Sequence, residues 1–492
     1  MPGLTSGLFV GLSGLHAQQA ALNVVGHNIA NVNTAGYARQ RVDMSTLDSQ
    51  FFGGIGYGPG VTLSKVQGVR DSLLELQMYS AQARQAGMQT RYESLEVVAA
   101  PLADEGVTGI GSQIQKFFQG FQELSTRPED LSLRQNLIGV AQNLITTLQS
   151  RYKELDDMAS RADTSVLNDI SEVNSLASQI AVLNQRIAAE PSPGADSDAR
   201  DQRKALTDQL SKLVGINVFE DGQGQYQITL DSGAATLVAG VNAYSLRATR
   251  DPALNNHYRV DAIMGSAIVN VTSRITDGDI GGQLDLRDTI LPGYQTQLDE
   301  LAAGFVSQVN LVHRTGYDRN AAVTGTDFFQ GALANGANGL PPTVTAATNY
   351  KGMVNALSVN AAVVANPSLV AASGTLGAPG DNAIARALAN LQKATATVDT
   401  NGDGVGDSGP YSQFIGLIVS KVGSQAQGLK VAADNQLNLV TALQNQRDRV
   451  SGVDLDEEAA SLMNYQRGYQ ASARFISVIN DLTDQLVNQL VR

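Results

Sequence analysis

Apolar residues recur every seven positions at both ends of this 492-residue chain, and this repeat constrains the fold more than any other feature. Near the N-terminus the repeat consists of Leu8, Leu15, Leu22 and Ile29, with Leu12 between the first two. A seven-residue apolar repeat predicts a narrow helical stripe of the kind that packs in coiled coils. We therefore predict a helix over residues 4–30, ending in the turn-forming residues Asn28, Asn31, Asn33 and Gly36.

The C-terminal repeat has a defined start. Asp454 lies three positions before Glu457, the spacing of a capping box, so a helix is predicted over residues 454–490. Its apolar stripe contains Leu455, Leu462, Tyr469, Ile476, Ile479 and Leu486. Because both ends carry a stripe, we predict that they pack in one unit and that the middle of the chain is looped out.

The intervening sequence predicts long helices interrupted by a β-rich segment. The predicted helices cover residues 71–99, 109–189 with a break near Arg127, 282–313, 382–396 and 411–450. Helices of this length favour a rod over a compact globule. Six short alternating segments between Gly215 and Val271, separated by Asp-Gly and Ser-Gly turns, predict strands.

These patterns predict a mainly α fold with inserted β structure, arranged as an elongated rod built from both termini. We expect a terminal coiled-coil domain (1–50 plus 451–492), a helical rod domain (51–194, 276–317 and 383–450) and a β-rich outer domain (195–275). Residues 318–382 are rich in Gly, Ala and Asn and are expected to form a loose insert.

The composition excludes several classes of function. The formal charge of −13 argues against nucleic-acid binding, which needs a basic surface. The absence of Cys excludes thiolate nucleophiles and Cys-ligated zinc. No stretch reaches the roughly 20 apolar residues of a membrane span, and the N-terminus lacks the basic start of a cleavable signal peptide.

The N-terminal segment carries no charged side chain before Arg39. Gly7, Gly11 and Gly14 each lower its helix propensity by up to about 1 kcal/mol. This favours a segment that becomes helical only when packed, and a neutral surface allows many copies to lie side by side. The physics equally allows a core helix of a monomer, paired with the C-terminal helix.

The run from Ala21 to Gln40 resembles the N-terminal signature of the bacterial flagellar rod, hook and hook-associated proteins. The run from Ser451 to Ala471 resembles the C-terminus of the hook-associated members that join hook to filament, and residues 213–218, 281–288 and 291–294 resemble internal segments of the same group. The matches extend over the chain from end to end, but the inserts at about 220–275 and 318–382 resemble no known segment.

This resemblance implies a non-enzymatic structural protein of the hook–filament junction, exported by the flagellar type III apparatus and located outside the cell. It implies a ring of copies in contact with the hook protein and the second junction protein FlgL, with the C-terminal helix held before export by a FlgN-type chaperone. The assembly interface would comprise the stripe residues together with Asn28, Asn31, Asn33, Gly36, Tyr37 and Arg39. For Arg39 and its neighbour Arg41, an intersubunit ion pair and an ordinary surface charge are both open.

One segment matches part of a calcium-binding loop. Its ligand positions would be Asp399, Asn401, Asp403 and Asp407, with Gly404 at the sharp turn. The twelfth position is Pro410 instead of the expected Glu, so the simpler interpretation is an acidic surface loop. We expect no cofactor, with weak calcium binding as the alternative.

Three other functions compete with the junction hypothesis. The nearest is another axial protein, such as a hook or distal-rod subunit, which the acidic C-terminal motif and the long helices over residues 109–189 disfavour. It would be a surface adhesin or calcium-dependent binder if the middle domains carried the function. An enzyme is the third, but no catalytic constellation supports it.

Overall fold

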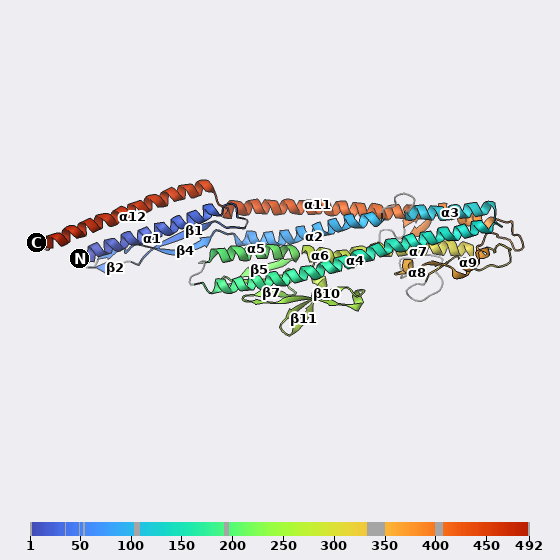
Figure 1. The fold of residues 1–492 in the computed structure, drawn as a ribbon, viewed down its shortest axis with the longest axis horizontal. Helices are drawn as coiled ribbons and strands as arrows, with labels where there is room; N and C mark the ends of the chain where they lie inside the picture. The colour runs from blue at the N-terminus through green and yellow to red at the C-terminus, as the bar shows by residue number, and fades with distance from the viewer. Residues whose placement is uncertain are drawn as a thin grey trace.

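The computed structural model describes residues 2–34, 36–48, 50–52, 55–102, 109–190, 196–331, 350–398 and 407–490. The chain forms an elongated rod with both termini at one end (Figure 1). This confirms the predicted fold class of long terminal helices with small antiparallel sheets in the middle.

The end that holds both termini is built from two helices and two hairpins. Helix α1 (Pro2–Ala30) lies beside α12 (Leu455–Leu490), as the terminal repeats predict (Figure 1). Strand β1 (Gln40–Thr46) runs antiparallel to β4 (Val61–Gly68), with Gln40 opposite Gly68. Between them, β2 (Gln50–Phe52) and β3 (Ile55–Tyr57) form a short hairpin.

Long helices form the body of the rod. They are α2 (Ser72–Leu102), α3 (Ile110–Thr126), α4 (Leu131–Ala188), α7 (Leu291–His313) and α11 (Tyr411–Ser451). The side chain of Asp130 caps α4 by accepting hydrogen bonds from Ser132 N (2.8 Å) and Leu133 N (3.3 Å). From there α4 continues for 58 residues without a break, which confirms the predicted break before it and resolves the region as one helix.

An aromatic cluster fills the core at the end of the rod opposite the termini. The rings of Phe117, Phe118, Phe121, Phe305, Phe328 and Phe329 are all fully buried. Phe117 lies at the centre, and its ring meets that of Phe305 edge to face at 5.3 Å between centroids. Edge-to-face pairs add stability beyond the area that they bury, so this cluster holds α3 and α7 together.

The β-rich segment lies along α4 and follows α5 (Ser197–Leu213) (Figure 1). One sheet has the order β5-β6-β7-β8, with strands Ile216–Glu220, Tyr226–Leu230, Thr236–Ala239 and Asn242–Ala243. The other has the order β11-β10-β9, with strands Ala267–Asn270, Tyr258–Met264 and Ser245–Arg250. All six predicted strand segments are confirmed, and the sequence patterns missed the two-residue β8.

A buried ion pair anchors the second sheet to the rod. Helix α6 (Gly278–Asp285) passes through a π-helical turn (Leu286–Ile290) into α7. This turn carries the buried Arg287, whose Nη1 donates to Asp163 Oδ1 on α4 at 2.7 Å and to the carbonyl oxygen of Tyr258 at 2.7 Å. One guanidinium therefore joins α4, the π-helical turn and β10.

Within the predicted loose insert (318–382), the described residues 318–331 and 350–382 pack more tightly than expected. Phe328, Phe329, Tyr350, Met353 and Val354 are buried in the same core as α4 and α7. In the sequence, the few apolar residues that pack into the core are scattered among many small residues and are hard to recognise. The helices and strands here are only a few residues long, so they give no clear periodicity. These elements are β12 (Phe329–Gln330), α8 (Met353–Ala356), β13 (Ser358–Val359) and α9 (Ala361–Ala365).

The remaining elements are short. They are α10 (Ala383–Asn390), the β14–β15 hairpin (Ala396–Val398 and Asp407–Gly409) and 3-10 turns at Pro252–Leu254, Thr272–Arg274, Pro367–Leu369 and Leu391–Lys393. The structure describes no helix with the length and hydropathy needed to cross a membrane.

Replacing the central ring of the aromatic cluster tests its contribution. We expect Phe117→Ala to lower the free energy of unfolding by about 3–5 kcal/mol, because it leaves a cavity among five other rings. The control is Phe219→Ala at a 69% exposed ring, which should change stability by less than about 0.5 kcal/mol. Urea unfolding followed by circular dichroism measures both, and equal effects would contradict the assignment of Phe117 to the core.

Asp169 on α4 provides a pH-dependent test of packing. Burial, with the carboxylates of Asp279 and Glu172 nearby, raises the pKa of Asp169 to about 6. The charged form therefore destabilises the folded state above this pH, whereas below about pH 4 the group is protonated in both states.

We expect Asp169→Asn to stabilise the protein at pH 7–8 and to have no effect near pH 3.5. The full shift corresponds to about 3 kcal/mol, and partial exposure to solvent reduces the expected gain to about 1 kcal/mol. Thermal unfolding at the two pH values measures the difference. A gain of equal size at both would show that the charge of Asp169 is not its cause.

Candidate functional site: the paired terminal helices

The face that α1 turns toward α12 is made of small residues. Glycines lie along this face at positions 7, 11 and 14, followed by the buried Ala21 and Val25. A Cβ atom at Gly11 would lie only 2.7 Å from Ile476 Cγ1, and one at Gly7 would lie 3.1 Å from Ile479 Cδ1. Glycine is therefore needed here for the two backbones to approach each other.

The approach is tight from the side of α12 as well. A Cβ atom at Gly468 would lie 2.8 Å from the side-chain amide carbon of Gln18. Leu462, Tyr469, Ile476 and Ile479 are half-buried, as the C-terminal stripe predicts. At both ends of that stripe the side chains, Leu455 and Leu486, are instead exposed.

The N-terminal leucine stripe does not form the seam between the two helices. Leu8 and Leu12 are 37% and 43% exposed, and Leu15, Leu22 and Ile29 are only half-buried. The seam runs one residue earlier, through Gly7, Gly11, Gly14, Ala21, Val25 and Asn28. Both stripes have the same heptad period, so periodicity could not distinguish them, and the larger side chains gave the stronger apolar signal.

As a result, the paired helices present an apolar outer surface. Within the described residues it comprises Leu8, Phe9 and Leu12 on α1 and Phe475, Val478, Leu482, Leu486 and Val487 on α12. All of these side chains are exposed, and Phe9 is 66% exposed. Clusters of large exposed apolar side chains on a helix pair are typical of sites of association.

A buried polar clasp holds the two helices at the end where they join the rod. Asn28 is almost fully buried, and its Nδ2 donates to the carbonyl oxygen of Gln40 (2.9 Å) and to Glu458 Oε2 (3.1 Å). Its Oδ1 accepts from Gln40 N at 2.9 Å and from the hydroxyl of Tyr37 at 2.8 Å. Burial and the carboxylates of nearby acidic residues raise the pKa of Tyr37, so the phenol stays protonated and donates.

Arg39 completes the clasp. Its Nε donates to Glu458 Oε1 at 2.7 Å, its Nη1 donates to Glu457 Oε2 at 2.6 Å, and its backbone N donates to the carbonyl oxygen of Ser451 at 2.8 Å. Partial burial opposes the charge of Arg39, but the hydrogen bonds and charges of the two glutamates outweigh it and raise the pKa. The described contacts of Arg39 are therefore within the chain, whereas Arg41 is exposed beside Asp43.

The predicted turn residues lead the chain from α1 to β1. The Nδ2 atom of Asn31 donates to the carbonyl oxygen of His27 at 3.0 Å, and Asn33 is exposed. Gly36 has a φ of +81°, a left-handed conformation that favours glycine. Sequence reasoning missed Ser13, whose hydroxyl accepts from Val61 N at 3.2 Å and ties β4 to α1.

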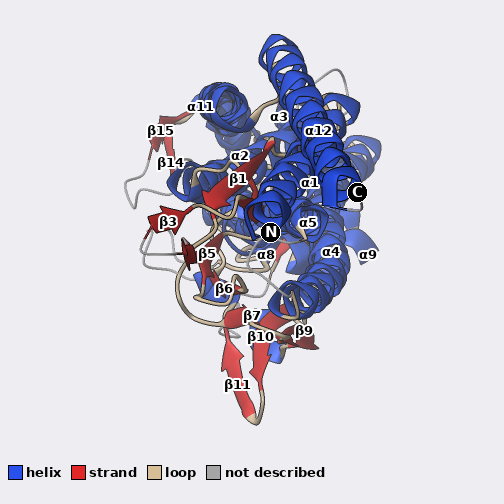
Figure 2. Ribbon diagram, turned by 90° about the vertical axis from the view of Figure 1, so that its left-hand side faces the viewer, coloured by secondary structure: helices blue, strands red, loops and turns tan. Residues whose placement is uncertain are grey.

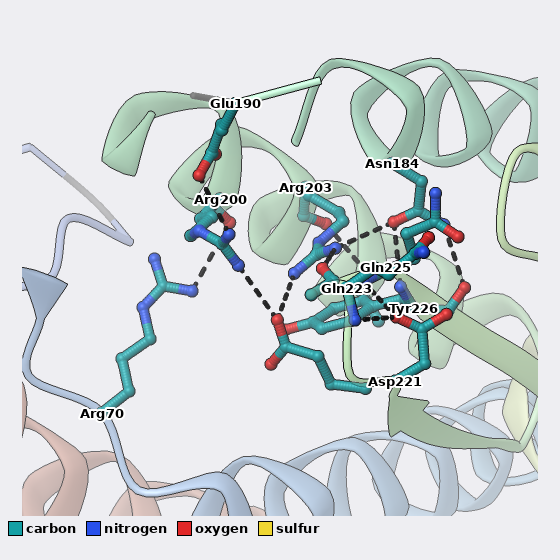
Figure 3. Close-up of polar contacts among 12 residues, drawn as sticks. Arg70, Asn184, Glu190, Arg200, Arg203, Asp221, Gln223, Gln225 and Tyr226 are labelled. Atoms are coloured by element: carbon teal, nitrogen blue, oxygen red, sulfur yellow. Dashed lines mark hydrogen bonds and ion pairs between the residues drawn. The ribbon is translucent and has the colours of Figure 1, made fainter. Parts of the chain in front are cut away.

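A cleft of about 970 Å³ lies where the terminal unit meets the rod, between β4, the start of α2, the end of α4, α5 and the β5–β6 hairpin. Arg200 bonds to Glu190 (3.2 Å) and Glu220 (3.0 Å), as Figure 3 shows. Arg203 bonds to Glu220 (3.2 Å) and lies over the ring of Tyr226 at 3.5 Å. Because these charges are paired with each other, the cleft is better suited to joining the two units than to holding an ion.

The candidate calcium ligands Asp399, Asn401 and Asp403 lie outside the described residues, and the backbone of Asp407 begins β15. In the part of the chain that the structure describes, no three His, Asp or Glu side chains are grouped to hold a metal ion. The prediction of weak calcium binding therefore stays untested.

Comparisons with known proteins relate each part of the chain to flagellar components. Residues 95–329 match the helical domain of the flagellar hook-associated protein FlgK. Residues 8–37 match the flagella basal body rod protein family, and residues 444–490 match the C-terminal region of the basal body rod FlgEFG proteins.

Two full-length relatives and one solved structure agree with these matches. Flagellar hook-associated protein 1 of Salmonella typhimurium is 30% identical over 97% of this chain and 98% of its own. The protein of the same name from Bacillus subtilis is 27% identical over 98% and 97%. The flagellar hook junction protein FlgK of Burkholderia pseudomallei has a similar fold, with a TM-score of 0.62, 18% identity and coverage of 76% of this chain and 100% of its own.

Leucine substitutions at two glycines of α1, one inside the seam and one outside it, test the close packing of the terminal helices. We expect Gly11→Leu to separate the terminal helices, because the new side chain would overlap Ile476 and Phe475. Gly26→Leu is the matched control, since no atom lies within 4 Å of a Cβ at that position. Hydrogen exchange of α12 in the purified chain measures the effect. Protection of α12 that survives Gly11→Leu would contradict the close-packed seam.

Proposed function

Because the chain belongs to the flagellar hook-associated protein 1 (FlgK) family, we propose that its paired ends build the hook–filament junction by packing against neighbouring copies. The chain is a structural component of the flagellum, and the prediction of a hook-associated protein is confirmed. Its full-length relatives are hook-associated proteins, which decides against the alternative of a hook or distal-rod subunit.

The exposed apolar surface of the terminal helices carries this proposal. Pairing of α1 with α12 buries the glycine face and leaves Leu8, Phe9 and Leu12 outside. A helix that served only the core of a monomer would expose fewer large apolar side chains. A side chain that is roughly half exposed gains up to about 1.5 kcal/mol when a neighbour covers it.

Coupled folding and assembly follows from the same surface. The seam glycines weaken α1 as an isolated helix. Pairing with α12 supplies part of the missing stability, and burial against neighbouring copies supplies the rest. In this proposal residues 1–50 and 451–492 are the assembling unit, the long helices are its scaffold, and the β-rich and Gly-rich segments lie outside the contact between copies at the ends.

The partners belong to the proposal as well. The ring of copies would sit on the hook protein below and present a matching surface to the second junction protein FlgL above. Export through the flagellar type III apparatus would place the chain outside the cell, and a FlgN-type chaperone would cover the apolar face of α12 beforehand. The role proposed is non-enzymatic and needs no cofactor.

A charge on the outer surface of α1 tests the function. We expect Leu12→Asp to abolish incorporation into flagella without unfolding the purified chain, because Leu12 is exposed and lies one residue beyond the seam glycine Gly11. Leu376→Asp is the control, since Leu376 is also largely exposed but belongs to another part of the chain. Each variant is expressed in a strain that lacks its own copy, and swimming and filament retention are scored. Normal filaments with Leu12→Asp would refute the proposal.

A further inference from the structure

The sheet β9-β10-β11 projects sideways from the rod, and β11 is its outermost strand (Figure 2). In the described part of the chain β11 pairs only with β10, with Ile263 opposite Ile268 and Ala262 opposite Val269. All four residues of β11 are exposed. Its outer edge therefore presents backbone donors and acceptors to solvent.

The opposite edge of the same sheet is closed. The side-chain amide of Asn174 on α4 donates to the carbonyl oxygen of Leu246 at 2.8 Å and accepts from Leu246 N at 2.8 Å. This amide takes the place of a neighbouring strand beside β9. At Leu246 the β9 edge is therefore covered by α4, whereas the β11 edge has no such cover among the described residues.

Strand β11 also lacks the features that usually prevent edge pairing. Residues 266–271 contain no charged residue and no proline, whereas edge strands of soluble proteins commonly carry one or the other. Ile268 is 56% exposed and Val269 is 36% exposed. The edge therefore offers both hydrogen-bonding groups and apolar contact.

The face of the sheet beside this edge is basic. Asp261 is buried and accepts from Arg259 Nε at 3.1 Å and from Thr249 Oγ1 at 2.9 Å, and Arg247 Nη2 lies 3.8 Å from its Oδ2. Arg259 also lies 3.6 Å from Asp251, and Arg250 lies 3.5 Å from Asp163. The carboxylates of Asp261 and Asp163 are buried, whereas the side chains of Arg247 and Arg250 are about half exposed, so guanidiniums are the charged groups that this face presents to solvent. Residues 245–270, which form the sheet and its turns, contain three arginines and two aspartates, a net charge of +1 within a chain of −13.

We propose that the β11 edge and the arginine face beside it bind the acidic exterior of a neighbouring copy of this chain. The charge contrast selects the occupant, because the rest of each copy is strongly acidic and a ring places copies side by side. A contact between two different surfaces of identical subunits is the kind that closes into a ring. This inference rests on the proposed function, which supplies the neighbouring copy.

Photocrosslinking in assembled flagella tests the contact. The photoreactive residue benzoylphenylalanine replaces Ile268 and, as a control, the exposed Leu376, in a strain that lacks its own copy. After irradiation of purified flagella we expect an adduct of twice the chain mass from position 268, joined to a peptide rich in Asp and Glu. The purified monomer should give none. In the same flagella Arg247→Glu should lower the yield about fivefold, and Arg274→Glu, an exposed arginine outside the strands, should not.

The outcomes separate this inference from the proposed function. If flagella contain the chain but position 268 gives no self-adduct, or crosslinks to another flagellar protein, the contact proposed here is wrong and the junction function stands. If the chain is missing from flagella even with unmodified termini, the function itself fails.

Discussion

The close approach of α1 to α12 determines how both ends of the chain are used. Glycine is a poor helix former, and its three occurrences on the inner face of α1 lower the stability of that helix alone. What they provide is backbone proximity, because Ile476 and Ile479 occupy the space that Cβ atoms would fill. The bulky residues, displaced from the seam, then lie on the outer surface, where they are available to other copies. The glycines on the inner face of α1 thus explain both the pairing of α1 with α12 and the exposure of the apolar residues that other copies can bind.

The polar clasp complements this apolar seam. Asn28, Arg39 and Glu458 come from α1, the following turn and α12, and the carboxylate of Glu458 accepts hydrogen bonds from both of the others. A buried, fully bonded network has few alternative arrangements, so it fixes the register that a smooth glycine seam leaves loosely defined. At the neighbouring joint, Arg70 at the start of α2 bonds to Asp201 on α5, which connects the terminal unit to the rod.

The sequence patterns predicted the long helices and the six strands because each has a strong period and clear turn or capping residues. They also placed both ends together. They failed in two places for identifiable reasons. Two heptad stripes one residue apart on α1 have the same period, so the pattern could not say whether Leu12 or Gly11 faces the partner. Residues 350–372 dock through isolated apolar side chains such as Met353 and Val363, whose spacing follows the shape of the core and no regular period. For Arg39 the sequence left an intersubunit ion pair and a surface charge open, and the structure pairs it with Glu457 and Glu458 of α12.

The clasp also requires that both ends of the chain be present before the terminal helices can pair. Arg39 and Glu458 are 419 residues apart, and Asn28 and Glu458 are 430 apart. Because Asn28 and Arg39 both bond to Glu458, the first helix acquires these contacts only when the last one is present. A chain that ends before residue 455 would retain the helices of the rod and the sheets but would lack α12, the helix that pairs with α1. Because the contacting residues lie at opposite ends of the chain, only a subunit with both ends intact can form the complete surface that neighbouring copies bind.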